Sequence, residues 1–128
     1  MSTRVSDVMT VSVAAIGVDT AIPTIAEVLS TRAVSAVPVV DRENRVIGIV
    51  SEADVLRHRF TGGTAADIMT RPVVTVRADQ SAATAAQLMQ RHAIKRLPVV
   101  DDVGRLVGIV SRSDLVDVLA RGDDLRIG

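Results

Sequence analysis

The sequence contains no cysteine, no tryptophan and no tyrosine, and Phe60 is its only aromatic residue. The absence of cysteine excludes disulfides and thiolate chemistry, and it leaves the redox compartment open. The near absence of aromatic rings removes the platform on which the bases of single-stranded nucleic acids stack. A core without large rings needs many aliphatic contacts instead, which suits buried strands rich in valine and isoleucine.

An excess of charge of either sign is also missing. The 15 Lys and Arg residues balance 15 Asp and Glu residues, so no overall field attracts nucleic acid or anionic lipid. Residues 1–4 lack the apolar run of a signal peptide. No stretch approaches the roughly 18 apolar residues of a membrane helix. We therefore expect a soluble, cytoplasmic protein that binds neither nucleic acid nor membrane.

The sequence repeats itself. A shift of 60 positions gives 18 identities over 54 aligned positions without a gap, which indicates two copies of one supersecondary unit. The matched motifs are Asp7–Thr10 with Asp67–Thr70, Val37–Asp41 with Leu97–Asp101, and Gly48–Asp54 with Gly108–Asp114. We expect repeat 1 at residues 1–60, a linker at 61–64, repeat 2 at 65–120 and a C-terminal tail at 121–128.

Both repeats predict the same order of elements, β-α-β-β-α, after a short helical turn. Apolar residues at helical spacing predict the first long helix, and short apolar runs around a polar turn predict a hairpin of buried strands. In repeat 1 the elements are a turn at 7–9, an extended piece at 11–13, a helix from Thr20 with Pro23 in its first turn, strands at 37–40 and 46–50, and a helix from Ser51. In repeat 2 they are a turn at 67–69, an extended piece at 73–76, a helix at 81–91, strands at 97–100 and 106–110, and a helix from Ser111.

One such repeat is marginal alone, because a chain of about 55 residues buries little surface. The predicted fold class is therefore α+β, with two βαββα repeats packed as a pseudo-two-fold pair. Such packing places equivalent residues of the two repeats around two related clefts.

Each closing helix begins with a Ser-x-x-Asp motif, Ser51 to Asp54 and Ser111 to Asp114. The motif fits a capping box, in which the serine caps the helix and the acid reaches back to the serine N–H. A carboxylate can also accept two hydroxyl groups at once, and this gives the motif a second, functional interpretation. Gly48 and Gly108 lie within predicted strands, where glycine indicates a close approach by a ligand or by another part of the chain.

The motifs Asp-x-Met-Thr, Pro-Val-Val-Asp and Gly-Ile-Val-Ser-x-x-Asp resemble those of the cystathionine-β-synthase (CBS) domain, and their duplication resembles the CBS pair, or Bateman module. The resemblance covers residues 5–118. Residues 115–126 also resemble CBS-pair proteins that continue into a BON domain. Since the chain stops at Gly128, we expect that domain to be absent or removed.

The resemblance implies a regulatory module that binds AMP, ADP, ATP or S-adenosylmethionine as a regulator, requires no cofactor, forms a homodimer and signals to a protein partner. It implies that Asp54 and Asp114 each hold a ribose, with Ser51 and Ser111 close to the sugar or phosphate. The implied adenine walls are Ile49, Met69, Pro72 and Val74 at the Asp54 cleft, and Ile109, Met9, Ser12 and Ala14 at the Asp114 cleft. Plain core packing would explain Ile49 and Ile109 equally well.

The repeats differ before the Pro-Val-Val-Asp strand, where repeat 2 has Lys95 and Arg96 and repeat 1 has Ser35 and Ala36. In the resembled family a basic residue here approaches the phosphates held at the other repeat's aspartate. We therefore expect Lys95 and Arg96 to complete the Asp54 cleft, because arginine binds phosphate in a bidentate manner. The Asp114 cleft then suits a less charged ligand. The alternative is that both cations form a solvated edge.

No catalytic or metal site emerges from the sequence. The two histidines, His58 and His92, occupy unmatched repeat positions and lack partners at metal or triad spacing. We expect both to be surface residues and the protein to be no enzyme. Two further hypotheses stay open: a ligand-free interaction scaffold, and an enzyme that acts on nucleotides.

Overall fold

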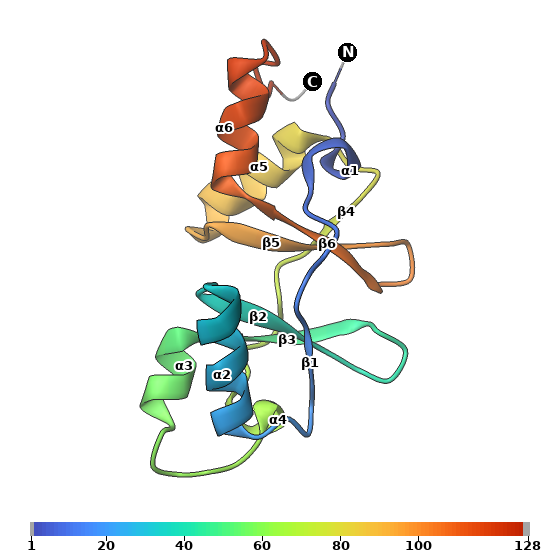
Figure 1. Cartoon of the computed structure of the whole chain (residues 1–128). Helices are drawn as coiled ribbons and strands as arrows, with labels where there is room; N and C mark the ends of the chain where they lie inside the picture. Colours follow the sequence, from blue (N-terminus) through green and yellow to red (C-terminus); the bar gives the residue numbers. More distant parts are fainter. Residues whose placement is uncertain (1, 127–128) are drawn as a thin grey trace. The chain divides into compact units, whose positions relative to one another are not determined.

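The computed structural model describes residues 2–126, and the chain divides into two compact units. The repeat-1 unit runs from Ala14 to Val73, and the repeat-2 unit combines the chain up to Val13 with the chain from Val74 onward (Figure 1). Residue 1 of predicted repeat 1 and residues 127–128 of the predicted tail lie outside the described part.

The repeat-1 unit contains one three-stranded sheet in the order β1-β2-β3. β1 runs parallel to β2, with Ile16 opposite Val39, and β2 runs antiparallel to β3, with Val37 opposite Val50. The elements are β1 (Ile16–Gly17), α2 (Ile22–Arg32), β2 (Ala36–Val40), β3 (Val46–Ser51), α3 (Glu52–Arg57) and α4 (Ala65–Ile68).

The repeat-2 unit has the same design, with a sheet in the order β4-β5-β6. β4 is parallel to β5, with Val76 opposite Val99, and β5 is antiparallel to β6, with Leu97 opposite Val110. The elements are α1 (Val5–Val8), β4 (Val76–Arg77), α5 (Ala82–His92), β5 (Arg96–Val100), β6 (Leu106–Ser111) and α6 (Arg112–Ala120).

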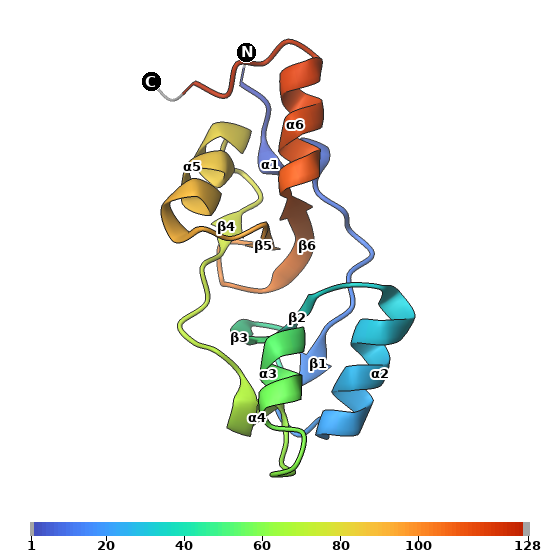
Figure 2. The ribbon, with the colours of Figure 1, turned by 90° about the vertical axis from the view of Figure 1, so that its left-hand side faces the viewer.

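Each unit buries one face of its sheet under two helices. Figures 1 and 2 show α2 and α3 on one face of the first sheet, and α5 and α6 on one face of the second. The buried clusters are aliphatic with one methionine, as the missing aromatics predicted, and Phe60 is 86% exposed. The fully buried side chains include Ile25, Val37 and Val50 in the first cluster and Leu97, Val99 and Val110 in the second.

The predicted βαββα order and the α+β class are confirmed, and the helix and hairpin bounds agree within one or two residues. The extended piece predicted at 11–13 is wrong. The first strand lies at Ile16–Gly17 instead, because Ile16 is buried and pairs with Val39 while Val11 is 70% exposed. Its counterpart, predicted at 73–76, is a strand only at Val76–Arg77.

The compact units do not coincide with the sequence repeats. Helix α1 comes from repeat 1, yet it contacts α6 and buries Val5 in the repeat-2 core. Helix α4 comes from repeat 2, yet it buries Ala65 and Ile68 in the repeat-1 core. The two repeats have exchanged their first segments, and the predicted bounds at 1–60, 61–64, 65–120 and 121–128 stay predictions. None of the helices in residues 2–126 is both long and apolar enough to cross a membrane.

Candidate functional site

The Ser51-x-x-Asp54 motif joins the end of β3 to the start of α3. The Ser51 hydroxyl accepts the Asp54 backbone N–H at 3.1 Å, and Asp54 Oδ2 accepts the Ser51 backbone N–H at 2.9 Å. Two helix-terminal donors are thereby satisfied reciprocally. The same box joins β6 to α6, with the corresponding distances 3.3 and 2.8 Å between Ser111 and Asp114. The capping interpretation is therefore confirmed in both repeats.

The carboxylate of Asp54 has donors beyond its cap. Its residue is only 5% exposed, and it is the one charged residue among the buried residues of the described chain. The Thr70 hydroxyl donates to Asp54 Oδ2 at 3.4 Å, and Arg57 Nη1 donates to Asp54 Oδ1 at 3.3 Å. A buried carboxylate needs such partners, because an unpaired charge is costly to desolvate.

Asp114 has the same place in its unit but fewer partners. It is half-buried, and the Ser111 N–H is the only donor to its carboxylate within residues 2–126. The residue at the position of Arg57 is Asp117, which is exposed and forms no ion pair within that part of the chain. The two carboxylates thus share a backbone setting but differ in the charge beside them.

Gly48 and Gly108 mark the close approach of the exchanged segments. A β-carbon on Gly48 would overlap the Met69 sulfur, and one on Gly108 would lie 2.8 Å from the Met9 sulfur and 2.9 Å from the Thr10 carbonyl oxygen. Tight packing between the two sequence repeats therefore explains both glycines. The contact occurs inside each compact unit.

Backbone bonds fix the exchanged segments beside the capping strands. Thr70 and Ile49 exchange two N–H to carbonyl bonds of 2.8 and 3.1 Å, and Thr10 and Ile109 exchange two of 2.8 and 2.9 Å. These bridges hold the Asp-x-Met-Thr motif next to the strand that leads into the capping box. Thr70 is thereby placed to reach Asp54.

The structure sorts the predicted site residues between the units. In the repeat-1 unit it places Ser51, Asp54, Ile49, Met69 and Pro72, and in the repeat-2 unit Ser111, Asp114, Ile109, Met9 and Ser12. Ile49, Met69, Ile109 and Met9 are half-buried, whereas Pro72 and Ser12 are exposed. Four residues predicted to line a cleft belong to the unit that does not contain the aspartate of that cleft. They are Val74, Lys95 and Arg96, predicted for Asp54, and Ala14, predicted for Asp114. Their pairing stays a prediction.

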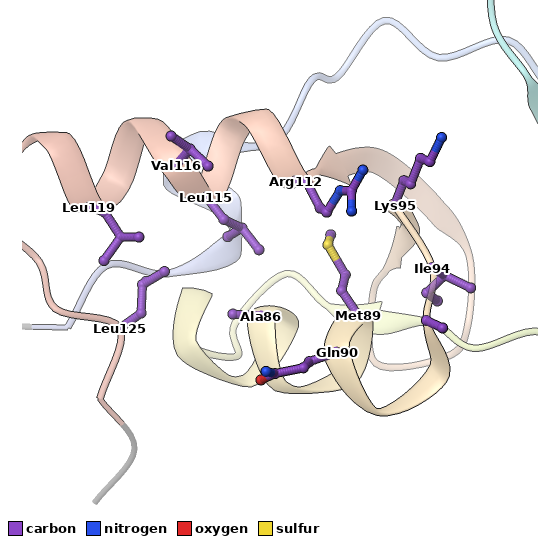
Figure 3. Close-up of a pocket in the computed structure, with 11 residues that line it drawn as sticks. Ala86, Met89, Gln90, Ile94, Lys95, Arg112, Leu115, Val116, Leu119 and Leu125 are labelled. Carbon is purple, nitrogen blue, oxygen red and sulfur yellow. The ribbon is translucent and has the colours of Figure 1, made fainter.

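Lys95 borders a groove of about 450 Å³ between α5 and α6 in the repeat-2 unit. Figure 3 shows Lys95 and Arg112 at one end of this groove and Leu119 and Leu125 at the other. The Arg112 backbone N–H donates to the Lys95 carbonyl at 2.9 Å, which holds the backbones of these two basic residues together. Met89 and Leu115 lie between the ends, so the groove is mainly aliphatic.

Sequence reasoning missed two residues at Asp54. Thr70 could have been found, because Asp-x-Met-Thr is identical in both repeats. Arg57 gave no such signal, because its counterpart is Asp117. The two histidines lie at helix ends, with His58 half-buried and His92 exposed. Within the described residues, no three His, Cys, Asp or Glu side chains cluster as metal ligands would.

Comparison with known proteins matches the chain to one protein family and finds solved structures with a similar fold. The model of the CBS domain matches residues 5–60 and again 65–121. The structure of CBSX2 in complex with AMP, a CBS-pair protein from Arabidopsis thaliana, is 29% identical, with a TM-score of 0.85 over 93% of this chain and 97% of that one. The CBS domain pair of protein MJ0100, in complex with 5′-methylthioadenosine and S-adenosyl-L-methionine, is 28% identical, with a TM-score of 0.83 over 94% and 98%.

A curated relative carries the same module inside a longer protein. Homoserine O-acetyltransferase of Methanococcoides burtonii is 39% identical over 114 residues, which are 88% of this chain and 23% of that protein. The chain thus spans about a quarter of that relative.

Proposed function

Since the chain belongs to the CBS domain family and carries two copies of the domain, we propose that it is a sensor that binds an adenosyl compound and signals the bound state to a partner protein. The observation that carries the proposal is the pair of equivalent carboxylates, Asp54 and Asp114, each fixed by a capping box at the end of a strand. Similar structures hold AMP, or 5′-methylthioadenosine and S-adenosyl-L-methionine.

In this proposal each aspartate accepts the two ribose hydroxyls. Its two oxygens offer about four lone-pair sites, and the capping box occupies one of them at each aspartate. At Asp54 the Thr70 hydroxyl and the Arg57 guanidinium take two more, so a ribose there must displace at least one of these donors. The proposed adenine contacts are Ile49, Met69, Pro72 and Val74 for Asp54, and Ile109, Met9, Ser12 and Ala14 for Asp114. Ser51 and Ser111 lie beside the sugar, and Lys95 and Arg96 serve the phosphates at Asp54.

The proposed role is regulatory and not catalytic. In each capping region the serine hydroxyl accepts a backbone N–H and the aspartate accepts the serine N–H, so both groups serve the helix start. In the longer acetyltransferase the module occupies about a quarter of the chain, which is consistent with a part that senses and does not itself react. The predicted homodimer, protein partner and cytoplasmic location stay predictions.

Calorimetric titration with AMP, ADP, ATP and S-adenosylmethionine tests the proposal. We expect saturable binding of at least one of them. Asp54→Ala and Asp114→Ala should each abolish binding at their own site only, the double variant should bind nothing, and Asp19→Ala, an exposed control in the repeat-1 unit, should bind as the wild type does. Thermal unfolding of each variant without ligand separates lost binding from lost folding. Absence of binding by all four compounds at millimolar concentration would contradict the proposal.

The ligand-free scaffold is the competing function, and ligand-dependent stability separates the two. A ligand present at 100 times its Kd stabilises the folded state by about 2.7 kcal/mol. A sensor therefore shows a higher Tm with its ligand. A scaffold shows the same Tm with every adenosyl compound.

A further inference from the structure

The charge next to the proposed ribose-binding carboxylate is opposite in the two repeats. Arg57 lies one helical turn after Asp54, and its guanidinium Nη1 is 3.3 Å from Asp54 Oδ1. Asp117 occupies the same place after Asp114. Residues three apart on a helix are neighbours on its surface, so a cation flanks one site and an anion flanks the other.

Each of the two helices also begins with a charged residue. Arg112, the first residue of α6, lines the groove between α5 and α6 at its Lys95 end (Figure 3). Glu52 is its counterpart in α3. Within α3, Arg57 is the charged side chain that contacts the Asp54 carboxylate.

Arg57 is free to change partner. Its side chain is 66% exposed while that of Asp54 is 8% exposed, and ion pairs with an exposed member are weak. A ribose whose hydroxyls take both Asp54 oxygens would displace the guanidinium from Oδ1. The displaced guanidinium stays on the helix that carries Asp54, three residues away. Charges this close to a bound ligand are only partly screened, because the Debye length is about 8 Å at physiological salt.

The 5′ group is where adenosyl compounds differ most in charge. AMP carries a phosphate there, whereas S-adenosylmethionine carries a positively charged sulfonium. The guanidinium of Arg57, once released from Asp54, attracts the phosphate of AMP. The carboxylate of Asp117 repels that phosphate and attracts the sulfonium of S-adenosylmethionine. The same ribose and adenine contacts can thus be combined with opposite preferences for charge.

We propose that Arg57 and Asp117 set ligand specificity, so that the Asp54 site takes a 5′-phosphorylated adenosine and the Asp114 site takes an adenosyl compound with a neutral or positive 5′ group. This inference rests on the proposed adenosyl-binding function. It adds to the proposed role of Lys95 and Arg96 one selecting residue within each unit, three positions after the aspartate of the Ser-x-x-Asp motif.

The test measures each site alone. Asp114→Ala leaves the Asp54 site, and Asp54→Ala leaves the Asp114 site. For each, the Kd values of AMP, adenosine and S-adenosylmethionine are determined by calorimetry. We expect the Asp54 site to prefer AMP to adenosine and the Asp114 site to prefer S-adenosylmethionine to AMP.

Charge exchange between the repeats gives the decisive comparison. Arg57→Asp, added to Asp114→Ala, should lower the AMP preference over adenosine by about three- to tenfold, and Asp117→Arg, added to Asp54→Ala, should raise it by a similar factor. Both effects should shrink with added salt, which a purely structural role would not produce. Arg42→Asp makes the same change of total charge in the exposed hairpin turn and should leave the preference unchanged.

The outcomes separate the two proposals. Ligand binding whose charge preference is unaffected by Arg57→Asp and Asp117→Arg overturns the specificity assignment alone. Absence of binding by every adenosyl compound at both isolated sites, in variants that melt as folded proteins, overturns the adenosyl-binding function and this assignment together.

Discussion

The Met69 sulfur occupies the space that a β-carbon on Gly48 would need. The residues are 21 positions apart and belong to different sequence repeats, yet they pack within one compact unit. Met9 and Gly108 repeat this relationship at a separation of 99 positions. Both contacts fix the Asp-x-Met-Thr segment against the strand that ends in the capping serine.

We expect Gly48→Ala and Gly108→Ala to lower the free energy of unfolding by about 1–3 kcal/mol, because the added methyl group overpacks the contact. Gly108→Ala should be the more harmful of the two. Its new β-carbon meets the Thr10 carbonyl oxygen, which cannot rotate away as a methionine side chain can. Urea unfolding measures both.

Gly17→Ala is the matched control for these variants. Gly17 lies in a strand, and nothing stands within 4 Å of the position that a β-carbon would take there. Alanine at this position should leave stability unchanged or raise it slightly, since it restricts the unfolded chain. Equal effects of all three substitutions would refute the packing explanation.

The capping serines should each contribute measurable stability. Ser51→Ala and Ser111→Ala remove the acceptor of the Asp54 and Asp114 N–H groups, and loss of such a cap costs about 0.5–2 kcal/mol. Ser30→Ala, within α2, should cost nothing, because alanine favours the helix interior. Thermal or urea unfolding of the three variants checks this order. A loss in Ser30→Ala as large as in the other two would argue against capping.

Acid should lower the stability of the fold by protonating the aspartate in the hairpin turn between β5 and β6. The Arg105 backbone N–H, foremost, and that of Val103 lower the pKa of Asp101 from its usual 3.8, as does the Arg105 side chain. The unfolded chain therefore binds more protons than the folded one in this range. The contribution is present above pH 3.8 and is lost as the pH falls through the lowered pKa.

Asp101→Asn should reduce stability more at neutral pH than at a pH well below 3.8, where the wild-type carboxyl is itself protonated. Urea unfolding across this range measures the difference. Asp102→Asn alters the adjacent acid, which accepts none of the turn's hydrogen bonds within residues 2–126, and should leave the pH dependence of the wild type intact. The prediction would be contradicted if Asp101→Asn lowered the free energy of unfolding by the same amount at every pH.

Asp123 ties both ends of the described chain together. Its Oδ2 accepts the Thr3 N–H at 3.0 Å, and its Oδ1 accepts the Leu125 N–H at 2.9 Å. Asp123→Ala should speed hydrogen exchange at both amides and cost about 1 kcal/mol, since hydrogen bonds to charged groups contribute at least that much. Asp124→Ala removes the bond to the Arg126 N–H and the 3.4 Å ion pair with the Arg126 guanidinium. Neither contact involves Thr3, so hydrogen exchange at the Thr3 amide should stay unchanged in this variant.

Local chemistry made much of the site predictable. The Ser-x-x-Asp motif specifies its own geometry, because the serine hydroxyl and the aspartate reach donors only three residues away. Pro23 in the first turn of α2 and the polar turn before Val46 are equally local signals. The position of Gly48 within a predicted strand also indicated a close neighbour, although the sequence left open which residue it is.

The strand before α2 was less predictable. Val11 and Val13 alternate as strand residues do, but a two-residue strand is defined by its partner, and the backbone of Ile16 pairs with Val39. The contact of the Arg57 side chain with Asp54 could not be predicted from the sequence either. Nothing in its neighbourhood along the chain requires a bond to Asp54, since a surface arginine has many rotamers and water as an alternative partner.

The amino-acid sequence by itself determined the duplication, the order of helices and strands and the capped carboxylates, because each depends on contacts within a few residues or on the identity of the copies. Only the tertiary structure decided which sheet each Asp-x-Met-Thr segment joins. Met9 could pack on Gly48 or Gly108 with nearly the same contacts, so the two repeats offer equivalent partners. The folded chain pairs Met9 with Gly108 and Met69 with Gly48, and that choice brings Thr70 to the carboxylate of Asp54.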